Sequence, residues 1–166
     1  FYGYMLMRIK NIASATAYKL VKFYSQSEFR PTMFEVGFGK GKELPPYKIQ
    51  TKDGELTLSG FIDRVDSATI NNQDYIAVTD YKSSEKRLDA ARIDAGITIQ
   101  PLIYANAVAK SSKDAKPAAM IYLQMNDPLT KFDTAPTPEE WEASLNDEIK
   151  AHGLFLDEAD VVAAFD

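Results

Sequence analysis

The sequence predicts an α/β fold with the element order helix, three strands, helix, strand. Apolar residues recur at helical spacing from Tyr4 to about Tyr24, and a second helical segment runs from Thr98 to about Lys110. Between these segments, apolar residues follow strand-like patterns. A chain of 166 residues with 45% hydrophobic and 26% charged residues has the size and composition of one globular domain. We therefore expect residues 1–166 to form a single domain.

Three strands are expected between the two helices. Pro31 favours extended backbone at Arg30 and so ends the first helix. The strands are expected at Met33–Phe38, Leu56–Asp63 and Tyr75–Lys82, with a loop rich in Gly and Pro at Gly39–Pro46. The turn-forming residues 71–74 can join the last two strands, so that all three form a meander.

The C-terminal third of the chain adds a fourth strand and two helices. Ala118–Met125 is an apolar run of strand length. A capping box with Pro at the first helical position predicts a helix over residues 137–151, and its members are Thr137, Pro138 and Glu140. A short final helix is expected after Asp157.

His152 is the single histidine of the chain. The helix predicted through Ala151 ends at Gly153, which places His152 in its last turn. A cation there complements the helix dipole. We therefore predict a structural role for His152.

Charged residues interrupt two of the predicted strands. Asp80 and Lys82 are two residues apart, so both side chains extend the face that Ile76 and Val78 begin. Asp63 ends the preceding strand, which the hairpin brings alongside. Two carboxylates and a lysine at one edge of a sheet can hold a hard divalent cation and activate a water molecule. The pattern indicates nuclease chemistry.

A solvated strand end is the simplest alternative explanation for a lone Asp-x-Lys sequence. Further features weigh against it: an acid interrupts the first strand, two serines follow the lysine, and two polar residues stand one turn apart at the start of the second helix. These residues are Glu35, Ser83, Ser84, Gln100 and Tyr104. Their convergence on one small core favours a functional site.

The order of these motifs resembles the PD-(D/E)XK nuclease superfamily. The resemblance extends over about Glu35–Met125 and rests on Glu35, Gly60–Asp66, Asp80–Ser84 and Gln100–Tyr104. Within the superfamily, the chain is similar to RecB-type nuclease domains, and most to the C-terminal nuclease domain of AddB/RexB subunits of bacterial helicase–nucleases. The resemblance implies a restriction-endonuclease-like αβββαβ core with a mixed central sheet flanked by helices. It also implies a DNA exonuclease that depends on Mg²⁺ or Mn²⁺ and serves double-strand-break repair and recombination.

The same resemblance implies a set of metal ligands. Asp63 and Asp80 are the leading ligands, and Glu35 is a third, either directly or through water. The backbone carbonyl of Tyr81 is a further ligand. Two or three carboxylates suffice for Mg²⁺, because this ion keeps several of its water molecules.

The remaining site residues carry roles that do not involve metal ligation. Lys82 is implied to orient the attacking water or to stabilise the charge of the transition state. Gln100 and Tyr104 match residues that position metal-bound groups or DNA in the family. A capping glutamine and a buried tyrosine explain this pair equally well.

The chain departs from the family pattern in two respects. It contains no cysteine, so no iron–sulfur cluster lies within this chain, whereas many AddB-type domains carry one. Its first helix contains no histidine, which some RecB-like nucleases use as an extra ligand. Beside the motif, Arg64 faces away from Asp63, which predicts packing or a salt bridge with Asp66. Asp66 itself is expected at a strand end or turn.

The net charge of −5 argues against tight DNA binding by this chain alone, because affinity for nucleic acid comes mainly from basic groups. The resemblance implies that a helicase motor subunit delivers DNA to it in the bacterial cytoplasm. No apolar run reaches the length of a membrane span, so no membrane association is expected. The chain begins at Phe1, and we expect it to be a domain cut from a longer protein.

Two other function classes remain open. A catalytically silent DNA-guiding or scaffold module would keep the same fold. Silent relatives usually lose the acid or the lysine, whereas Glu35, Asp63, Asp80 and Lys82 are all present. A metal-dependent hydrolase that acts on a non-nucleic substrate is the more remote class.

Overall fold

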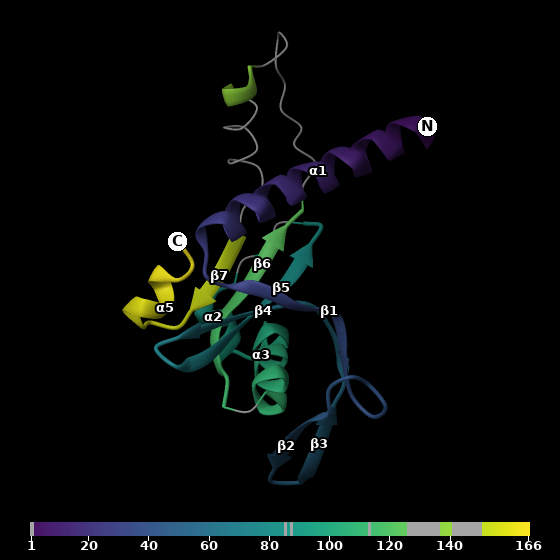
Figure 1. Ribbon diagram of the computed structural model, residues 1–166. Helices are drawn as coiled ribbons and strands as arrows, with labels where there is room; N and C mark the ends of the chain where they lie inside the picture. The colour runs from purple at the N-terminus through teal and green to yellow at the C-terminus, as the bar shows by residue number, and fades with distance from the viewer. Residues whose placement is uncertain (1, 85, 87, 113, 126–136, 141–150) are drawn as a thin grey trace.

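The computed structural model describes residues 2–84, 86, 88–112, 114–125, 137–140 and 151–166 (Figure 1). Its helices are α1 (Tyr2–Gln26), α2 (Ala90–Asp94), α3 (Gln100–Ser111) and α5 (Ala159–Ala163). Its strands are β1 (Arg30–Phe38), β2 (Tyr47–Thr51), β3 (Gly54–Leu58), β4 (Gly60–Ile70), β5 (Gln73–Lys82), β6 (Lys116–Gln124) and β7 (Ala151–Phe155). Five strands form one sheet in the order β1-β4-β5-β6-β7.

The central sheet is mixed, as expected. β1 pairs antiparallel with β4, and β4 pairs antiparallel with β5, which gives the predicted meander. Asn71 and Asn72 both have positive φ, 50° and 63°, a conformation that asparagine tolerates and that two-residue hairpins require. α3 carries the chain over the sheet to β6, which is parallel to β5, and β7 then pairs antiparallel with β6.

Helices cover both faces of this sheet (Figure 1). On the α3 side, sheet residues such as Ile76 and Val78 pack with Val108 of α3. On the opposite side, Ala77 of β5 belongs to a second core cluster with Phe29 and the α5 residue Val161. β5 therefore buries both of its faces, which explains its nearly continuous apolar sequence before Asp80.

The second predicted strand, Leu56–Asp63, is two separate elements. β3 ends at Leu58 and pairs with β2 in an independent hairpin, whereas β4 begins at Gly60 in the main sheet. A Cβ atom at Gly60 would lie 2.9 Å from the Phe38 ring, so this start of β4 has no room for a side chain. The available signal for the extra hairpin was the Asp-Gly sequence at residues 53–54, although the turn itself is Lys52-Asp53 and Gly54 begins β3.

The predicted capping box at residue 137 is present. The Thr137 N–H donates to Glu140 Oε2 at 2.9 Å, and the Glu140 N–H donates to Thr137 Oγ1 at 3.2 Å. The remainder of this predicted helix, residues 141–150, lies outside the described residues. The short helix expected after Asp157 is α5.

The predicted C-terminal end of that helix is wrong, because Ala151–Phe155 is strand β7. His152 is therefore not in a helical turn but opposite Tyr122 on β6. Pairing with β7 satisfies the hydrogen-bonding edge that β6 would otherwise expose, and this long-range gain outweighs the local helix signal. Gly153 suits the position, because a Cβ atom there would lie 3.0 Å from the Met120 carbonyl oxygen.

Candidate active site

Asp80 and Lys82 lie in contact at the end of β5. Lys82 Nζ forms an ion pair with Asp80 Oδ2, on the same face of the strand as Ile76 and Val78. Asp80 is 7% exposed, and its Oδ2 is buried without a hydrogen-bond partner. The two-residue spacing thus places an acid and an amine together in a shielded position, where their charges interact more strongly than in water.

Tyr122 lies beside this pair, opposite Asp80 in the β5–β6 ladder. Lys82 Nζ is 4.9 Å from the centre of its ring, a distance at which the cation is attracted to the aromatic face. Burial, followed by the Asp80 carboxylate, raises the pKa of Tyr122, so that the phenol stays neutral at physiological pH.

Asp63 reaches the backbone between these two residues. The paired residues of β4 and β5 end at Arg64 and Thr79, one step before Asp63. Asp63 Oδ2 instead accepts a hydrogen bond from the Tyr81 N–H at 2.8 Å. The carboxylate is therefore fixed on the peptide that joins Asp80 to Tyr81.

Glu35 lies across from Asp63 in the sheet, because its neighbours Phe34 and Val36 pair with Arg64 and Ile62. Its φ of 48° is in the left-handed region, which a residue other than glycine rarely adopts and which often marks a functional site. The side chain of Glu35 is exposed.

The structure does not gather a third acid with Asp63 and Asp80. Within residues 2–125 apart from 85, 87 and 113, and within 137–140 and 151–166, no three acidic or histidine side chains form a group that could hold a metal ion. The donor set nevertheless suits Mg²⁺ or Mn²⁺, since the Lys82 ammonium is the one charged partner of the buried Asp80 Oδ2 among the described residues. Two carboxylates with water molecules satisfy an octahedral ion.

Gln100 and Tyr104 form the other half of the site. The Gln100 side-chain amide donates to the Tyr104 hydroxyl at 2.6 Å, one turn along α3. The N-cap of α3 is Ile99, so the alternative in which Gln100 caps the helix is wrong. The Tyr104 ring packs edge to face against the Phe38 ring of β1, with 5.8 Å between the ring centroids. This contact positions Gln100 and Tyr104 relative to β1.

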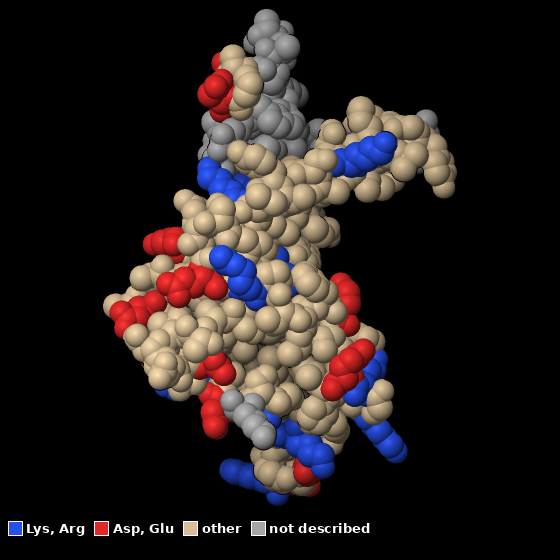
Figure 2. All heavy atoms as spheres, in the orientation of Figure 1, with Lys and Arg blue, Asp and Glu red and all other residues tan. Residues whose placement is uncertain are grey.

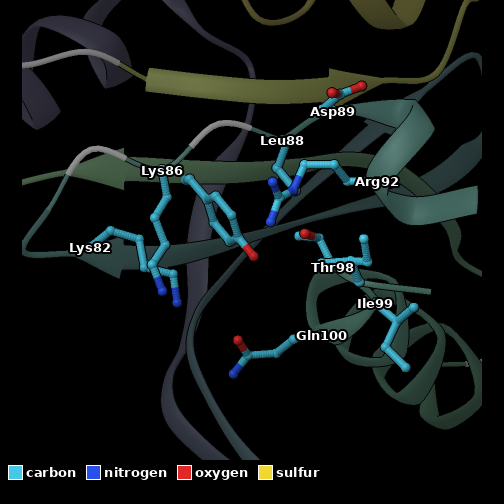
Figure 3. Close-up of a pocket in the computed structure, with 10 residues that line it drawn as sticks. Lys82, Lys86, Leu88, Asp89, Arg92, Thr98, Ile99 and Gln100 are labelled. Carbon is cyan, nitrogen blue, oxygen red and sulfur yellow. The ribbon is translucent and has the colours of Figure 1, made fainter. Parts of the chain in front are cut away.

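A cavity of about 960 Å³ opens beside Lys82 and Gln100 (Figure 3). Lys86 and Arg92 also line it, and neither is among the site residues that the sequence predicts. Lys86 precedes α2 and Arg92 lies on it. This helix has five residues and is too short for helical periodicity to reveal. The available signal was Asp89, whose side chain caps α2 by accepting from the Ala91 N–H at 2.9 Å.

A buried polar network lies on the opposite face of the sheet. The predicted Arg64–Asp66 salt bridge is confirmed, with 3.1 Å between Arg64 Nη2 and Asp66 Oδ2. Arg64 also donates to the Tyr81 hydroxyl at 2.8 Å, and the Tyr24 hydroxyl of α1 donates to Asp66 Oδ1 at 2.8 Å. Asp66 is 1% exposed in the middle of β4, so the expectation of a strand-end or turn position is wrong. Burial raises the pKa of Asp66, and Arg64 and Tyr24 oppose that rise.

We expect this network to make the free energy of unfolding fall at alkaline pH. Burial, followed by the Asp66 carboxylate, raises the pKa of Tyr24 well above its ordinary value, while Arg64 acts in the opposite direction and Tyr81 adds to the rise. The unfolded chain releases the Tyr24 proton near pH ~10, whereas the folded chain keeps it. The contribution of Tyr24 to the free energy of unfolding is therefore complete below that pH and is lost above it. Tyr24→Phe should therefore unfold more easily than wild type at pH 7, and the difference should shrink above pH ~10.

Chemical denaturation between pH 7 and 11 measures this difference. Tyr2→Phe, at an 83% exposed position of the same helix, is the matched control. A difference between wild type and Tyr24→Phe that stays constant across this range would contradict the expectation.

Comparison with known proteins supports the chemistry that the geometry indicates. A sequence model of the PD-(D/E)XK nuclease superfamily matches residues 2–163. An ATP-dependent helicase/deoxyribonuclease subunit from Exiguobacterium sibiricum is 36% identical over 99% of this chain and 15% of its own length. The protein of the same name from Clostridioides difficile is 32% identical over 99% of this chain and 15% of its own length. The chain thus spans about 15% of the length of these relatives.

The match extends over nearly the whole chain and therefore includes both strands that carry the paired acids and the lysine. No helix in the described part of the chain combines the length and hydropathy needed to cross a membrane. With Asp63, Asp80 and Lys82 placed together at one end of a mixed sheet, the sequence match and the site geometry agree: the chain belongs to the PD-(D/E)XK nuclease superfamily.

Proposed function

We propose that residues 1–166 form a divalent-metal-dependent DNA nuclease domain, an exonuclease, within a longer helicase–nuclease subunit. The observation that carries this proposal is the Asp80–Lys82 ion pair, with Asp63 hydrogen-bonded to the peptide beside it. The names of the two relatives support a DNA substrate and a helicase partner. Their length supports the place of this domain within a longer polypeptide.

The residues divide the chemistry among them. Asp63, Asp80 and the Tyr81 carbonyl would hold Mg²⁺ or Mn²⁺, with Glu35 as a further ligand, either directly or through water. A bound ion would supply Lewis acidity to the scissile phosphate and to a water molecule. Lys82 would orient that water molecule or stabilise the negative charge that develops on the phosphate.

Gln100 and Tyr104 hold the substrate on the α3 side of the site. Their mutual hydrogen bond fixes the amide of Gln100, whose side chain lines the cavity next to Lys82 (Figure 3). The amide therefore presents a preoriented polar group to DNA, and little side-chain entropy is lost when the strand binds.

Degradation of end-labelled linear DNA tests the proposal. The wild-type protein should shorten the DNA from its ends with Mg²⁺ or Mn²⁺ and should be inactive in a chelator. DNA without ends, as a closed circle, is the control for exonuclease action. Persistent absence of cleavage by a folded, metal-loaded protein that binds DNA would refute the nuclease proposal.

A silent DNA-guiding scaffold is the second candidate function. The lack of a three-acid group among the described residues favours it over a nuclease with a fuller metal site. The same assay separates the two, because a scaffold binds DNA without cutting it.

The domain should bind DNA weakly by itself. Its net charge is −5, and acidic and basic side chains are interspersed on the face shown in Figure 2. Binding should weaken further as salt rises, because contacts between basic side chains and phosphates release counterions. A bound divalent ion offsets the two carboxylates, so Ca²⁺ should tighten binding. Fluorescence anisotropy of a labelled oligonucleotide, with and without Ca²⁺ at two salt concentrations, measures the DNA affinity. Tight binding that is insensitive to salt and metal would contradict the expectation of weak binding.

The motor subunit of the helicase–nuclease compensates for this weak affinity by delivering a DNA strand to the site in the bacterial cytoplasm. Delivery by a linked motor replaces intrinsic affinity with a high local concentration of substrate. The exonuclease rate at low DNA concentration should therefore rise when the domain is part of its parent complex.

A further inference from the structure

The cavity beside Lys82 has two kinds of wall. Lys82, Lys86 and Arg92 supply positive charge, whereas the apolar residues Ile97 and Ile99 form another part of the lining. A nucleotide has the same division, because its phosphate is anionic and the face of its base is apolar. The volume of about 960 Å³ is at the upper end of the range typical of ligand sites.

Two basic groups of this cavity, Lys86 and Arg92, are available to a ligand. Neither Lys86 nor Arg92 forms an ion pair with any residue in the described part of the chain. Among the lining residues that the structure describes, Asp89 is the one acid, and its carboxylate is engaged as the cap of α2. Lys82 is paired with Asp80, so Lys86 and Arg92 are the two cations of the described lining without an ion-pair partner among the described residues. An anion placed here gains charge-assisted contacts without breaking an existing pair.

The apolar wall is also exposed. The side chains of Ile97 and Ile99 are 65% and 43% exposed, and Ile99 is the N-cap residue of α3. Apolar side chains of this kind contact the faces of unstacked bases in nucleic-acid-binding proteins. A base in a duplex presents only its edges to the grooves, so contact with both walls requires an unpaired nucleotide.

The cavity is continuous with the active site, because Lys82, Gln100 and Tyr122 belong to both. We propose that it is a nucleotide subsite that binds the residue adjoining the scissile phosphate. Lys86 and Arg92, which line the cavity in Figure 3, bind its phosphate. Ile97 and Ile99 contact its base. This inference rests on the proposed nuclease function and names the residues that hold the DNA strand beside the reacting bond.

Binding measured in Ca²⁺ tests the phosphate contacts separately from cleavage. Lys86→Ala combined with Arg92→Ala should reduce the slope of log affinity against log salt by about 0.7, because one phosphate of the single strand is no longer neutralised. In Mg²⁺, the double variant should raise KM with little change in kcat, because uniform binding is removed. Lys52→Ala, in the exposed turn of the β2–β3 hairpin, is the control and should change neither quantity.

An oligonucleotide without bases tests the apolar wall. Ile97→Ser with Ile99→Ser should weaken the binding of an ordinary single strand by about 3- to 10-fold and leave the binding of an all-abasic strand unchanged. Leu56→Ser on β3, a 48% exposed position outside the cavity, is the matched control. Equal effects of the Ile variants on both strands would overturn the base contact, and an unchanged salt slope for the Lys86/Arg92 variant would overturn the phosphate contact.

The nuclease proposal and this inference fail in different ways. If wild type cuts DNA but all cavity variants bind and cut normally, the subsite is wrong and the nuclease stands. If wild type does not cut but the cavity variants lose binding as described, the subsite stands and the domain guides DNA.

Discussion

Asp80→Asn should lower the rate of DNA cleavage by at least about 1,000-fold, because it removes a metal ligand and the partner that holds Lys82 in place. The structure supports a large effect, since Asp80 Oδ2 is buried and Lys82 is its only charged contact among the described residues. The variant should also lose affinity for Mn²⁺. Calorimetric titration with Mn²⁺ and single-turnover cleavage of end-labelled DNA measure the two losses.

Lys82→Met separates metal binding from catalysis. Lys82 Nζ pairs with the same carboxylate oxygen that the ion would use, so ammonium and metal compete for Asp80. Removing the amine should therefore raise Mn²⁺ affinity while cleavage falls by about 100- to 1,000-fold. Lys116→Met, at an exposed position at the start of β6, is the control. Native-rate cleavage by Asp80→Asn, or equal loss of metal binding by both variants, would contradict the assigned roles.

The elements that were predictable from the sequence are those fixed by neighbouring residues. Asn71 and Asn72 specify the β4–β5 hairpin by their left-handed backbone, and Thr137 with Glu140 specifies a helix start by two local hydrogen bonds. The Asp80–Lys82 pair was predictable for the same reason, because the two-residue strand period alone brings the side chains together.

The features that were not predictable depend on partners distant in the sequence. β7 is a strand because β6 offers it an edge, and nothing in residues 151–155 encodes that edge. The left-handed Glu35 changes which residues of β1 face the core: Met33 and Val36, three apart, both pack on the α3 side. A regular alternation would have placed Glu35 itself on that face. The cavity forms between β5, α2 and α3, so its lining follows only from the tertiary structure.

The same limit applies to the Arg64–Asp66 pair. The two-residue spacing predicts the salt bridge, but burial depends on α1, whose Tyr24 covers Asp66. Burial changes how much the loss of one partner of the ion pair costs in stability. An exposed ion pair contributes about 0–1 kcal/mol, whereas loss of one partner from a buried pair costs about 3–5 kcal/mol.

Arg64→Met should therefore reduce the free energy of unfolding by about 3–5 kcal/mol at pH 7, because it leaves the Asp66 carboxylate buried without its cation. Lys48→Met is the matched control: Lys48 pairs with Glu55 at 2.7 Å, but the side chains are 55% and 38% exposed. Its loss should cost no more than about 1 kcal/mol. Urea denaturation at fixed pH compares the two variants, and equal costs would contradict the burial argument.

The pH dependence of the Arg64→Met penalty identifies its cause. Burial already raises the pKa of Asp66 in the wild type, and removal of the guanidinium raises it further. Between the pKa of Asp66 in the unfolded chain and its higher value in the folded variant, the folded state binds more protons, so stability increases as pH falls. The difference in the free energy of unfolding between wild type and Arg64→Met should therefore narrow from pH 7 towards pH ~4.

Arg64→Met should also lose Mn²⁺ affinity even where it remains folded. Arg64 donates to the Tyr81 hydroxyl, and the Tyr81 N–H holds Asp63. A second change, Asp66→Leu, should restore stability but not that affinity, because it removes the buried charge without restoring the Tyr81 contact.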